Sequence, residues 1–480
     1  MESNNNSPSP SASTSFPPQM EEFKLEVIET VDEEKFSDQC EFIPRESLMT
    51  RLVSKYPSAK AIYVSFFIVL SYHLWIRLLQ YYLDDNIRTL HAGIVVKFMQ
   101  GFGNALLLWA LVVVVTIFIV SPIITLLGNK QIPLAIWSSL VIFSLCLVTP
   151  IGVLFFGIKH LSASALIIEM FRLKMKVIAF SVATSRKYRD YEEKMNRSKE
   201  DPNHFLPSPP ETSSVSNFLY FLFAPTLVYR DVYPKSESRS LLRIIRYSYE
   251  LVLIFMCFIP VGFWMTHSAD LIGLQPLPIT FLLSLIVPCM VIGLVIQLTI
   301  FYALLHCIQN IFAEILMFGD REFYTAWWEE PDPKLMYRKW NLIISNFCFS
   351  YIYLPLKSWS PSFAASLVLF LSAVLHETVI AFGCGFFLPV FFFFGSLFII
   401  YIGLQLAVPN IMGWLMKRPY ILYVYNWLAL GLFWTCLLLF NLIEYWSRQN
   451  CPAKQEVWYD IFIPRTISCI TIPGWYPWNS

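Results

Sequence analysis

The run SFAASLVLFLSAVLHETVIAFGCGFF, residues 362–387, decides the fold class of this 480-residue chain. It is long enough to cross the hydrocarbon core of a bilayer, which takes about 20 apolar residues per helix. The pair His376 and Glu377 interrupts the run near its middle. An ionisable side chain inside a membrane span is costly and usually serves a function. The run therefore predicts both a membrane helix and a candidate site.

The composition of the whole chain agrees with a membrane protein. Hydrophobic residues make up 56% of it and charged residues 14%, whereas charged residues are about 25% of an ordinary soluble domain. A soluble protein has too small an interior to hide this much apolar surface. A secreted disulfide scaffold and a mostly disordered chain are excluded as well. The net charge is only +1, so we expect no nucleic-acid partner.

Apolar runs of spanning length predict an all-α polytopic membrane protein with about nine transmembrane helices. The candidate spans are 61–83, 103–127, 133–157, 161–181, 248–268, 277–305, 361–383, 385–407 and 421–444. The run 161–181 carries Glu169, Arg172, Lys174 and Lys176, and we expect it to be tilted, buried or interfacial rather than lipid-facing. The stretch 341–356 is shorter and suits a re-entrant or surface helix.

The distribution of basic residues predicts the orientation. Lys and Arg are dense between 172 and 199, which marks a cytosolic loop. Counting spans from this loop places 318–340 in the cytosol and the C-terminus in the lumen. If 161–181 spans, the N-terminus lies in the cytosol; the alternative, in which 161–181 does not span, puts the N-terminus in the lumen and fits a tail without a signal peptide less well. We therefore expect a disordered cytosolic tail over 1–45, a transmembrane domain over 46–446 and a lumenal tail over 447–480. In the oxidising lumen Cys451 and Cys469 are expected to form a disulfide; the alternative is two free thiols.

Two segments carry candidate chemistry. Residues 318–341, FGDREFYTAWWEEPDPKLMYRKWN, concentrate aromatic and basic side chains, which favours a site for a nucleotide-bearing anionic ligand. The alternative is an aromatic belt at the membrane interface. His376 suits a general base near neutral pH, and the alternative is a structural histidine that bonds across helices. The motifs of zinc proteases, P-loop enzymes and serine hydrolases do not occur, so we expect no metal and no cofactor.

Several segments, in this order, resemble the sterol O-acyltransferases (acyl-CoA:cholesterol acyltransferases) of the membrane-bound O-acyltransferase family. FLFAPTLVYRDVYP (221–234) resembles FxFAPTLxYRDxYP, FGDREFYTAWWEE (318–330) resembles FGDRxFYxDWWN, and YRKWN (337–341) resembles YRxWN. SAVLHE (372–377) matches SAVxHE, and 448–469 is similar to the family's RQxCP…PRxxxC ending, with both cysteines at the same spacing.

The resemblance implies a fold whose helices enclose a catalytic chamber, and a reaction. That reaction is acyl transfer from a long-chain fatty acyl-CoA, as co-substrate, to the 3-hydroxyl of a sterol in the endoplasmic reticulum membrane, forming sterol esters for storage. His376 falls on the catalytic histidine, as general base, and Asn341 on a second catalytic residue that orients or polarises substrate. Positions associated with the acyl-CoA tunnel are Phe323, Tyr324, Trp327, Trp328, Tyr337, Arg338, Trp340 and Ser372. The resemblance also implies a homodimer or a dimer of dimers in contact with membrane lipid.

The chain departs from the family pattern in places. Ala326 and Glu329 replace the Asp and Asn of FYxDWWN, and Ser345 stands where a His is usual. Glu329 adds negative charge beside an expected phosphate binder, which is unfavourable. Two other hypotheses therefore stay open: an acyltransferase for diacylglycerol or another lipid alcohol, and a catalytically weakened relative that binds sterol.

Overall fold

The computed structural model describes residues 42–85, 93, 95–96, 99–120, 149–200, 215–274, 279–408, 410, 413–414, 417–450 and 463–465. Most of these residues are helical, and they contain no strand beyond two isolated bridges, Arg45–Asp320 and Lys235–Phe318. This confirms the all-α prediction for the described part of the chain. The tail before residue 42 and the predicted Cys451–Cys469 disulfide lie outside the described residues.

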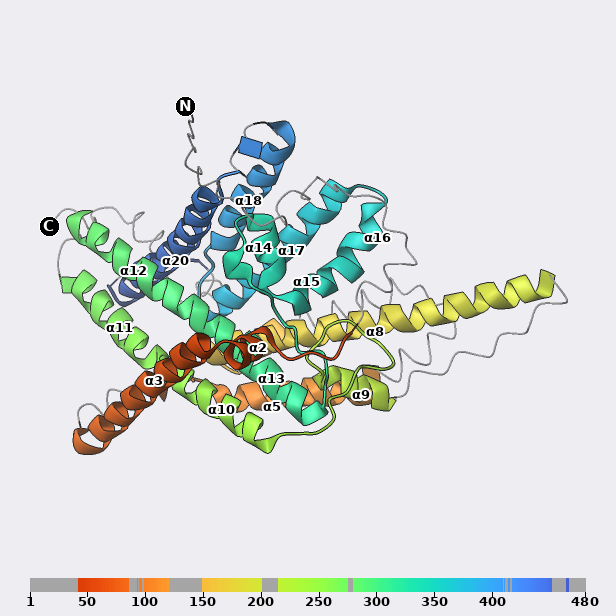
Figure 1. Cartoon of the computed structure of the whole chain (residues 1–480). Helices are drawn as coiled ribbons and strands as arrows, with labels where there is room; N and C mark the ends of the chain where they lie inside the picture. Colours follow the sequence, from red (N-terminus) through yellow and green to blue (C-terminus); the bar gives the residue numbers. More distant parts are fainter. Residues whose placement is uncertain are drawn as a thin grey trace, which may run out of the picture. The chain divides into compact units, whose positions relative to one another are not determined.

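The helices follow one another along the chain in Figure 1. They are α2 (Leu48–Lys55), α3 (Pro57–Leu83), α5 (Phe102–Val115) with the π-helical turn η2 (Thr116–Val120), α8 (His160–Glu200), α9 (Val215–Phe223), α10 (Leu241–Met256), α11 (Phe258–Leu274), α12 (Ile279–Phe301), the π-helical η3 (Tyr302–Ile308), α13 (Gln309–Leu316), the 3-10 turn η4 (Trp327–Glu329), α14 (Pro333–Trp340), α15 (Leu342–Cys348), the π-helical η5 (Phe349–Tyr353), α16 (Leu354–Lys357), α17 (Pro361–Cys384), α18 (Val390–Ala407) and α20 (Pro419–Asn450).

Six helices within the described residues are long and apolar enough to cross a membrane. They are Pro57–Leu83, Phe102–Val120, Leu241–Met265, Leu283–Leu316, Pro361–Cys384 and Pro419–Arg448. Most of the predicted span 133–157 lies outside the described residues, so the total of about nine stays a prediction. The predicted span 385–407 begins only at Val390, because Gly385 ends α17 with a φ of 79° and Pro389 precedes the first turn of α18.

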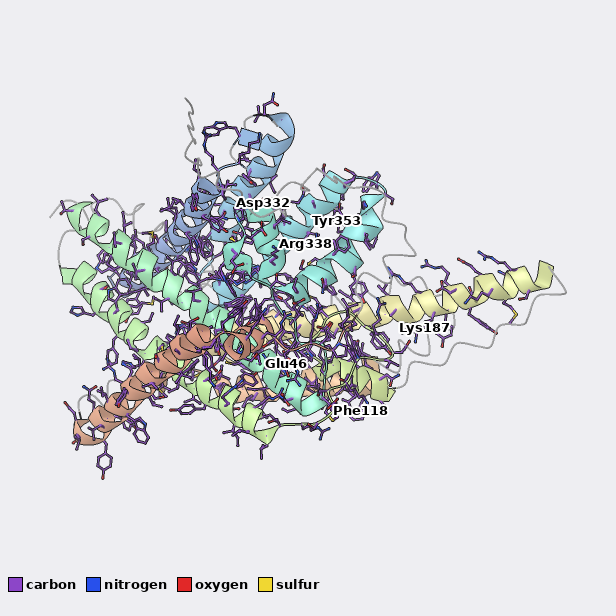
Figure 2. All side chains as sticks on the ribbon, in the orientation of Figure 1. Glu46, Phe118, Lys187, Asp332, Arg338 and Tyr353 are labelled. Atoms are coloured by element: carbon purple, nitrogen blue, oxygen red, sulfur yellow. The ribbon has the colours of Figure 1, made fainter. Side chains whose placement is uncertain are left out.

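The charged side chains of the run 161–181 lie on α8, where Lys174 and Lys176 are buried and Arg172 is half-buried. Lys176 is 1% exposed, and its Nζ donates to the carbonyls of Phe221 at 2.5 Å and Ala224 at 2.7 Å. Arg172 donates to the carbonyl of Leu222 at 2.5 Å. These carbonyls end α9, where a cation is favoured by the helix dipole. The result agrees with the expectation that this run is buried rather than lipid-facing. Further along α8, Lys187 (Figure 2) pairs with Asp231 at 2.5 Å.

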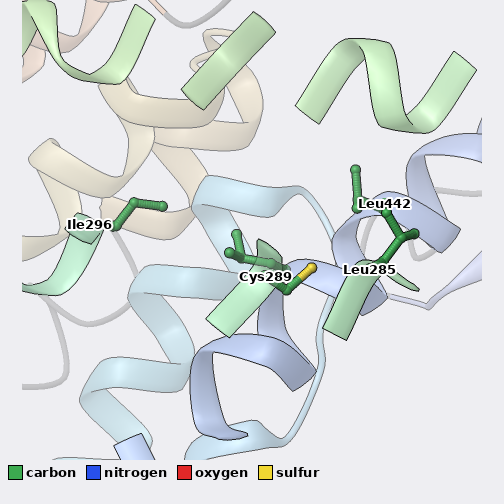
Figure 3. Close-up of a cluster of buried hydrophobic side chains, with 5 residues drawn as sticks. Leu285, Cys289, Ile296 and Leu442 are labelled. Atoms are coloured by element: carbon green, nitrogen blue, oxygen red, sulfur yellow. The ribbon is translucent and has the colours of Figure 1, made fainter. Parts of the chain in front are cut away.

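The helices α12 and α20 pack closely along one core. Its buried members are Leu285, Cys289, Ile296, Leu438 and Leu442, four of which Figure 3 labels. Gly293 lies at a close approach of the two helices, where an added Cβ would sit 2.1 Å from the Cβ of Trp434. The Trp434 indole donates to Gln297 Oε1 at 3.0 Å. Small residues allow such approach between membrane helices, so Gly293 sets this packing distance.

Candidate functional site

His376 projects from α17, whose two ends are defined by capping residues in the sequence. The Ser360 hydroxyl caps its N-terminus by accepting from the amide of Phe363, and Pro361 opens its first turn. His376 Nδ1 lies 2.7 Å from the carbonyl oxygen of Ser372 and 3.4 Å from the Ser372 hydroxyl. A carbonyl oxygen accepts only, so Nδ1 carries the proton. Nε2 keeps its lone pair, which is the tautomer a general base requires.

One side of the imidazole lies against an aromatic ring of α18. The rings of His376 and Phe391 stack with centroids 4.6 Å apart and an interplanar angle of 27°. On its other side Phe391 meets Phe433 of α20 edge-on at 4.7 Å. The His376 residue is nevertheless exposed.

Asn341 lies at the junction of α14 and α15. Its Oδ1 caps α15 by accepting from the amide of Ile344 at 3.1 Å. The Nδ2 group is left as a donor, since the described residues offer it no hydrogen-bond acceptor. The structure does not bring Asn341 and His376 into hydrogen-bond contact. The connection between them runs through α15, η5 and α16, which pack in succession toward α17.

The helix α14 carries the accessible basic groups. Asp332 caps it by accepting from the amide of Lys334 at 3.0 Å, and burial raises the pKa of this carboxyl. Lys334 and Arg338 are exposed and one turn apart, and among the described residues neither side chain forms a salt bridge, although the charge of Lys334 acts on the nearby Asp332 carboxyl. Figure 2 labels Asp332 and Arg338 at the two ends of this helix. In contrast, Lys339 pairs with Glu330. Of the basic side chains in this segment, Lys334 and Arg338 are those free to meet an anion.

The aromatic residues of the segment 318–341 divide into two groups. Phe323, Tyr324 and Trp327 are 2%, 0% and 2% exposed, so they form packed core. Trp328 and Trp340 are half-buried, and Tyr337 is 57% exposed.

Sequence reasoning missed the residue that organises the buried group. Phe301, the last residue of α12, has its ring 4.8 Å from Tyr324, 5.4 Å from Trp327 and 4.8 Å from Trp340. Burial raises the pKa of the Tyr324 phenol, which stays protonated and lies 2.9 Å from His306 Nδ1. Nothing in the local sequence distinguishes Phe301 from the other apolar residues of its run.

One face of α18 connects α14 with His376. The ring of Tyr337 lies 5.1 Å from that of Phe398, while the ring of Phe391 lies on His376. Phe391 and Phe398 are seven residues apart, so they share a helix face and are separated by roughly 10 Å along the axis. The exposed end of α14 and the imidazole therefore border the same stripe of α18.

The motif at 221–234 supports the segment that begins at Phe318. The amide of Gly319 donates to the carbonyl of Pro234 at 2.8 Å. A Cβ at Gly319 would lie 3.0 Å from that oxygen, so the close approach favours glycine. On its other side this segment meets Arg45, which donates from its amide to Gly319 and pairs with Asp320 at 2.7 Å. Pro234 and Arg45 thus hold the start of the segment 318–341 in place from two sides.

A buried ion pair anchors the same segment. The side chains of Arg321 and Glu314 are 3% and 1% exposed and are in direct contact. Glu314 also accepts from Arg243 at 3.1 Å and from the amide of Ser240 at 3.1 Å. Several donors satisfy this carboxylate, as a buried charge requires. Arg321, a basic residue of the predicted ligand segment, therefore has a structural role and is not available to bind an anionic ligand.

A small cavity of about 10 Å³ lies beside the buried tryptophan. It is lined by Trp327, Trp328, Glu330, Met336, Tyr423, Asn426, Trp427 and Leu430. The indole Nε1 of Trp327 is buried without a hydrogen-bond partner in the described part of the chain. The departures Ala326 and Glu329 flank this tryptophan, and Glu329 is exposed. Within the described ranges no three His, Cys, Asp or Glu side chains gather as a metal site would need.

Comparisons with known proteins relate the sequence to one family. The model of the membrane-bound O-acyltransferase family matches residues 134–442. Sterol O-acyltransferase 1 of Mus musculus is 34% identical over 328 residues, covering 66% of this chain and 56% of the relative. Sterol O-acyltransferase 1 of Chlorocebus aethiops is 30% identical over 452 residues, covering 89% of this chain and 77% of the relative. Sterol O-acyltransferase 2 of Rattus norvegicus is 34% identical over 277 residues, which is 54% of this chain and 49% of that protein. The match thus spans about half of the mouse and rat relatives.

Proposed function

Because this chain belongs to the membrane-bound O-acyltransferase family, we propose that it transfers a long-chain acyl group from fatty acyl-CoA to the 3-hydroxyl of a sterol. The single observation that carries the proposal is the hydrogen bond of His376 Nδ1 to the Ser372 carbonyl. In the neutral imidazole this bond leaves the lone pair on Nε2, on an exposed residue of a membrane helix. The relatives' name, sterol O-acyltransferase, supports a sterol as the acceptor.

In the proposed reaction His376 is the general base. The sterol hydroxyl gives its proton to Nε2 while its oxygen attacks the thioester carbonyl carbon. The negative charge that develops on the carbonyl oxygen accepts a hydrogen bond from Asn341 Nδ2, whose Oδ1 is already held by the α15 cap. The carbon–sulfur bond then breaks, and the departing sulfur takes the proton from Nε2. The products are a sterol ester and free CoA, with no acyl-enzyme intermediate.

The proposed acyl-CoA position follows the stripe of α18 that borders both α14 and His376. The CoA phosphates would meet Lys334 and Arg338, which are exposed and form no salt bridge in the described part of the chain. Tyr337 and the half-buried Trp328 and Trp340 offer aromatic surface to the rest of the CoA group. The thioester would extend along α18 toward Phe391 and reach His376. The buried Phe323, Tyr324 and Trp327 support this site from behind.

The proposal includes an arrangement in the cell. We place the protein in the endoplasmic reticulum membrane, with the N-terminal tail and α14 in the cytosol, where acyl-CoA is available. The C-terminal tail with Cys451 and Cys469 would lie in the lumen. A homodimer or dimer of dimers remains a prediction from the resemblance. Diacylglycerol is the second candidate acceptor, because the catalytic groups would act on any lipid hydroxyl.

Competition between acceptors tests the proposal. The full chain is expressed in cells that lack sterol-esterifying and triglyceride-forming activity, and their membranes receive labelled oleoyl-CoA with cholesterol and diacylglycerol together. We expect the label in sterol ester. Label in triacylglycerol alone would assign the other acceptor. Correctly folded protein that labels neither lipid would contradict the proposed activity.

A further inference from the structure

The side chain of Glu377 points away from the exposed face that bears His376. It is 2% exposed, whereas His376 is exposed. Consecutive helix residues are about 100° apart around the axis and do not face each other. No hydrogen bond joins the two side chains, whose positions are both described. Glu377 therefore does not act on the imidazole directly.

Glu377 instead reaches the first turn of the next helix. Its Oε2 accepts from the amide of Phe391 at 3.1 Å. The residue that precedes α18, Pro389, makes no side-chain capping bond. The first amides of a helix lack intrahelical partners, and an unsatisfied amide at membrane depth costs several kcal/mol. A carboxylate at this helix N-terminus is also favoured by the helix dipole.

The amide that Glu377 holds belongs to the residue whose ring lies on His376. The backbone of Phe391 is fixed by this hydrogen bond, and its ring is held between the His376 imidazole and Phe433. Movement at the start of α18 would shift this ring by a similar amount. The position of the imidazole then depends on a cap supplied by its own neighbour in the sequence.

We infer that Glu377 is a positioning residue for His376, because it caps α18 and thereby fixes the Phe391 ring against the imidazole. The inference rests on the proposed function, in which His376 is the base. It also accounts for the adjacency of the two residues: one α17 turn presents His376 to substrate and Glu377 to the helix that carries the supporting ring.

The test compares five variants of the full chain in sterol esterification with labelled oleoyl-CoA. Glu377→Gln keeps an acceptor for the Phe391 amide and is expected to keep kcat within about twofold of the wild type. Glu377→Leu removes the acceptor, and Phe391→Leu removes the flat ring. Each of these is expected to lower kcat by about tenfold or more, with the KM for oleoyl-CoA unchanged.

The double variant, Glu377→Leu with Phe391→Leu, decides whether one residue acts through the other. We expect its loss to be close to that of the more impaired single variant, because both changes remove the same support. Phe393→Leu is the matched control: Phe393 also lies in α18 but is 59% exposed, and this variant should retain wild-type kcat.

Three results would overturn the inference. A Glu377→Gln variant as impaired as Glu377→Leu would show that the charge acts, not the hydrogen bond. Multiplying losses in the double variant would show independent roles. A loss of oleoyl-CoA affinity without loss of kcat would show a binding role. The same cycle measured by melting temperature tests the coupling without catalysis. If the wild type forms no sterol ester, the proposed function is refuted. The melting temperatures of the same variants still show whether Glu377 and Phe391 are coupled.

Discussion

The packing of α12 against α20 predicts that adding one methyl group at Gly293 measurably lowers the free energy of unfolding. Gly293→Ala places a Cβ 2.1 Å from the Cβ of Trp434, about 1.4 Å short of the ~3.5 Å at which two carbons make favourable contact. The atom met is the stem of the side chain, which cannot rotate away. The two helices must therefore separate or tilt.

The magnitude follows from three contributions. Overpacking of this kind costs about 1–3 kcal/mol. Strain on the hydrogen bond between Trp434 and Gln297 costs about 1 kcal/mol. Alanine gains about 1 kcal/mol over glycine in a helix. The free energy of unfolding is therefore expected to fall by about 1–3 kcal/mol, the sum of these contributions.

The matched control is Gly403→Ala in α18, where an added Cβ meets no heavy atom within 4 Å. This variant should be as stable as the wild type or up to about 1 kcal/mol more stable, because only helix propensity changes. Both variants are purified in detergent and titrated with denaturant, with unfolding followed by tryptophan fluorescence. Equal stability of Gly293→Ala and Gly403→Ala would refute the packing argument.

Three further predictions concern the buried supports of the site and the base. Arg321→Met removes one of three donors that the described residues offer the Glu314 carboxylate, which keeps Arg243 and the amide of Ser240, and should lower the free energy of unfolding by about 1–3 kcal/mol in the same titration; a variant as stable as the wild type would contradict the structural role of this pair. Phe301→Ala empties the centre of the aromatic cluster and should lower the unfolding free energy by about 3–5 kcal/mol, which a smaller loss than about 1 kcal/mol would contradict. Ser372→Ala keeps the carbonyl that holds His376, so the esterification rate should stay within about twofold of the wild type; a tenfold loss would assign the role to the hydroxyl.

The sequence was sufficient to predict the helix that bears the candidate base. The apolar run, Ser360 and Pro361 at its start and Gly385 after its end define α17 as Pro361–Cys384, against a predicted 361–383. These signals are local, so they can be read from a single chain. The class of protein was predictable for the same reason, since composition and run length are enough to indicate membrane helices.

Contacts between distant segments were not predictable from the sequence. The carbonyls that accept from Lys176 lie at and just beyond the end of α9, more than 40 residues further along the chain, and no local sequence pattern indicates them. The residues next to Phe301 in the sequence are as apolar as those elsewhere in its run, yet its ring contacts three other aromatic rings. The division of the aromatic segment into buried and accessible residues likewise depends on tertiary packing. In the sequence Glu377 looks like the partner of the adjacent His376, whereas in the structure its carboxylate accepts from the amide of Phe391.

The measurement that tests the central claim most directly compares wild type and His376→Ala as purified proteins, supplied with labelled oleoyl-CoA and cholesterol. Removal of a general base lowers a rate by about 10²–10⁴-fold. We expect a loss of this size in sterol ester formation, with unchanged elution from a sizing column and unchanged binding of oleoyl-CoA. A variant that forms sterol ester at the wild-type rate would contradict the assignment of His376 as the base.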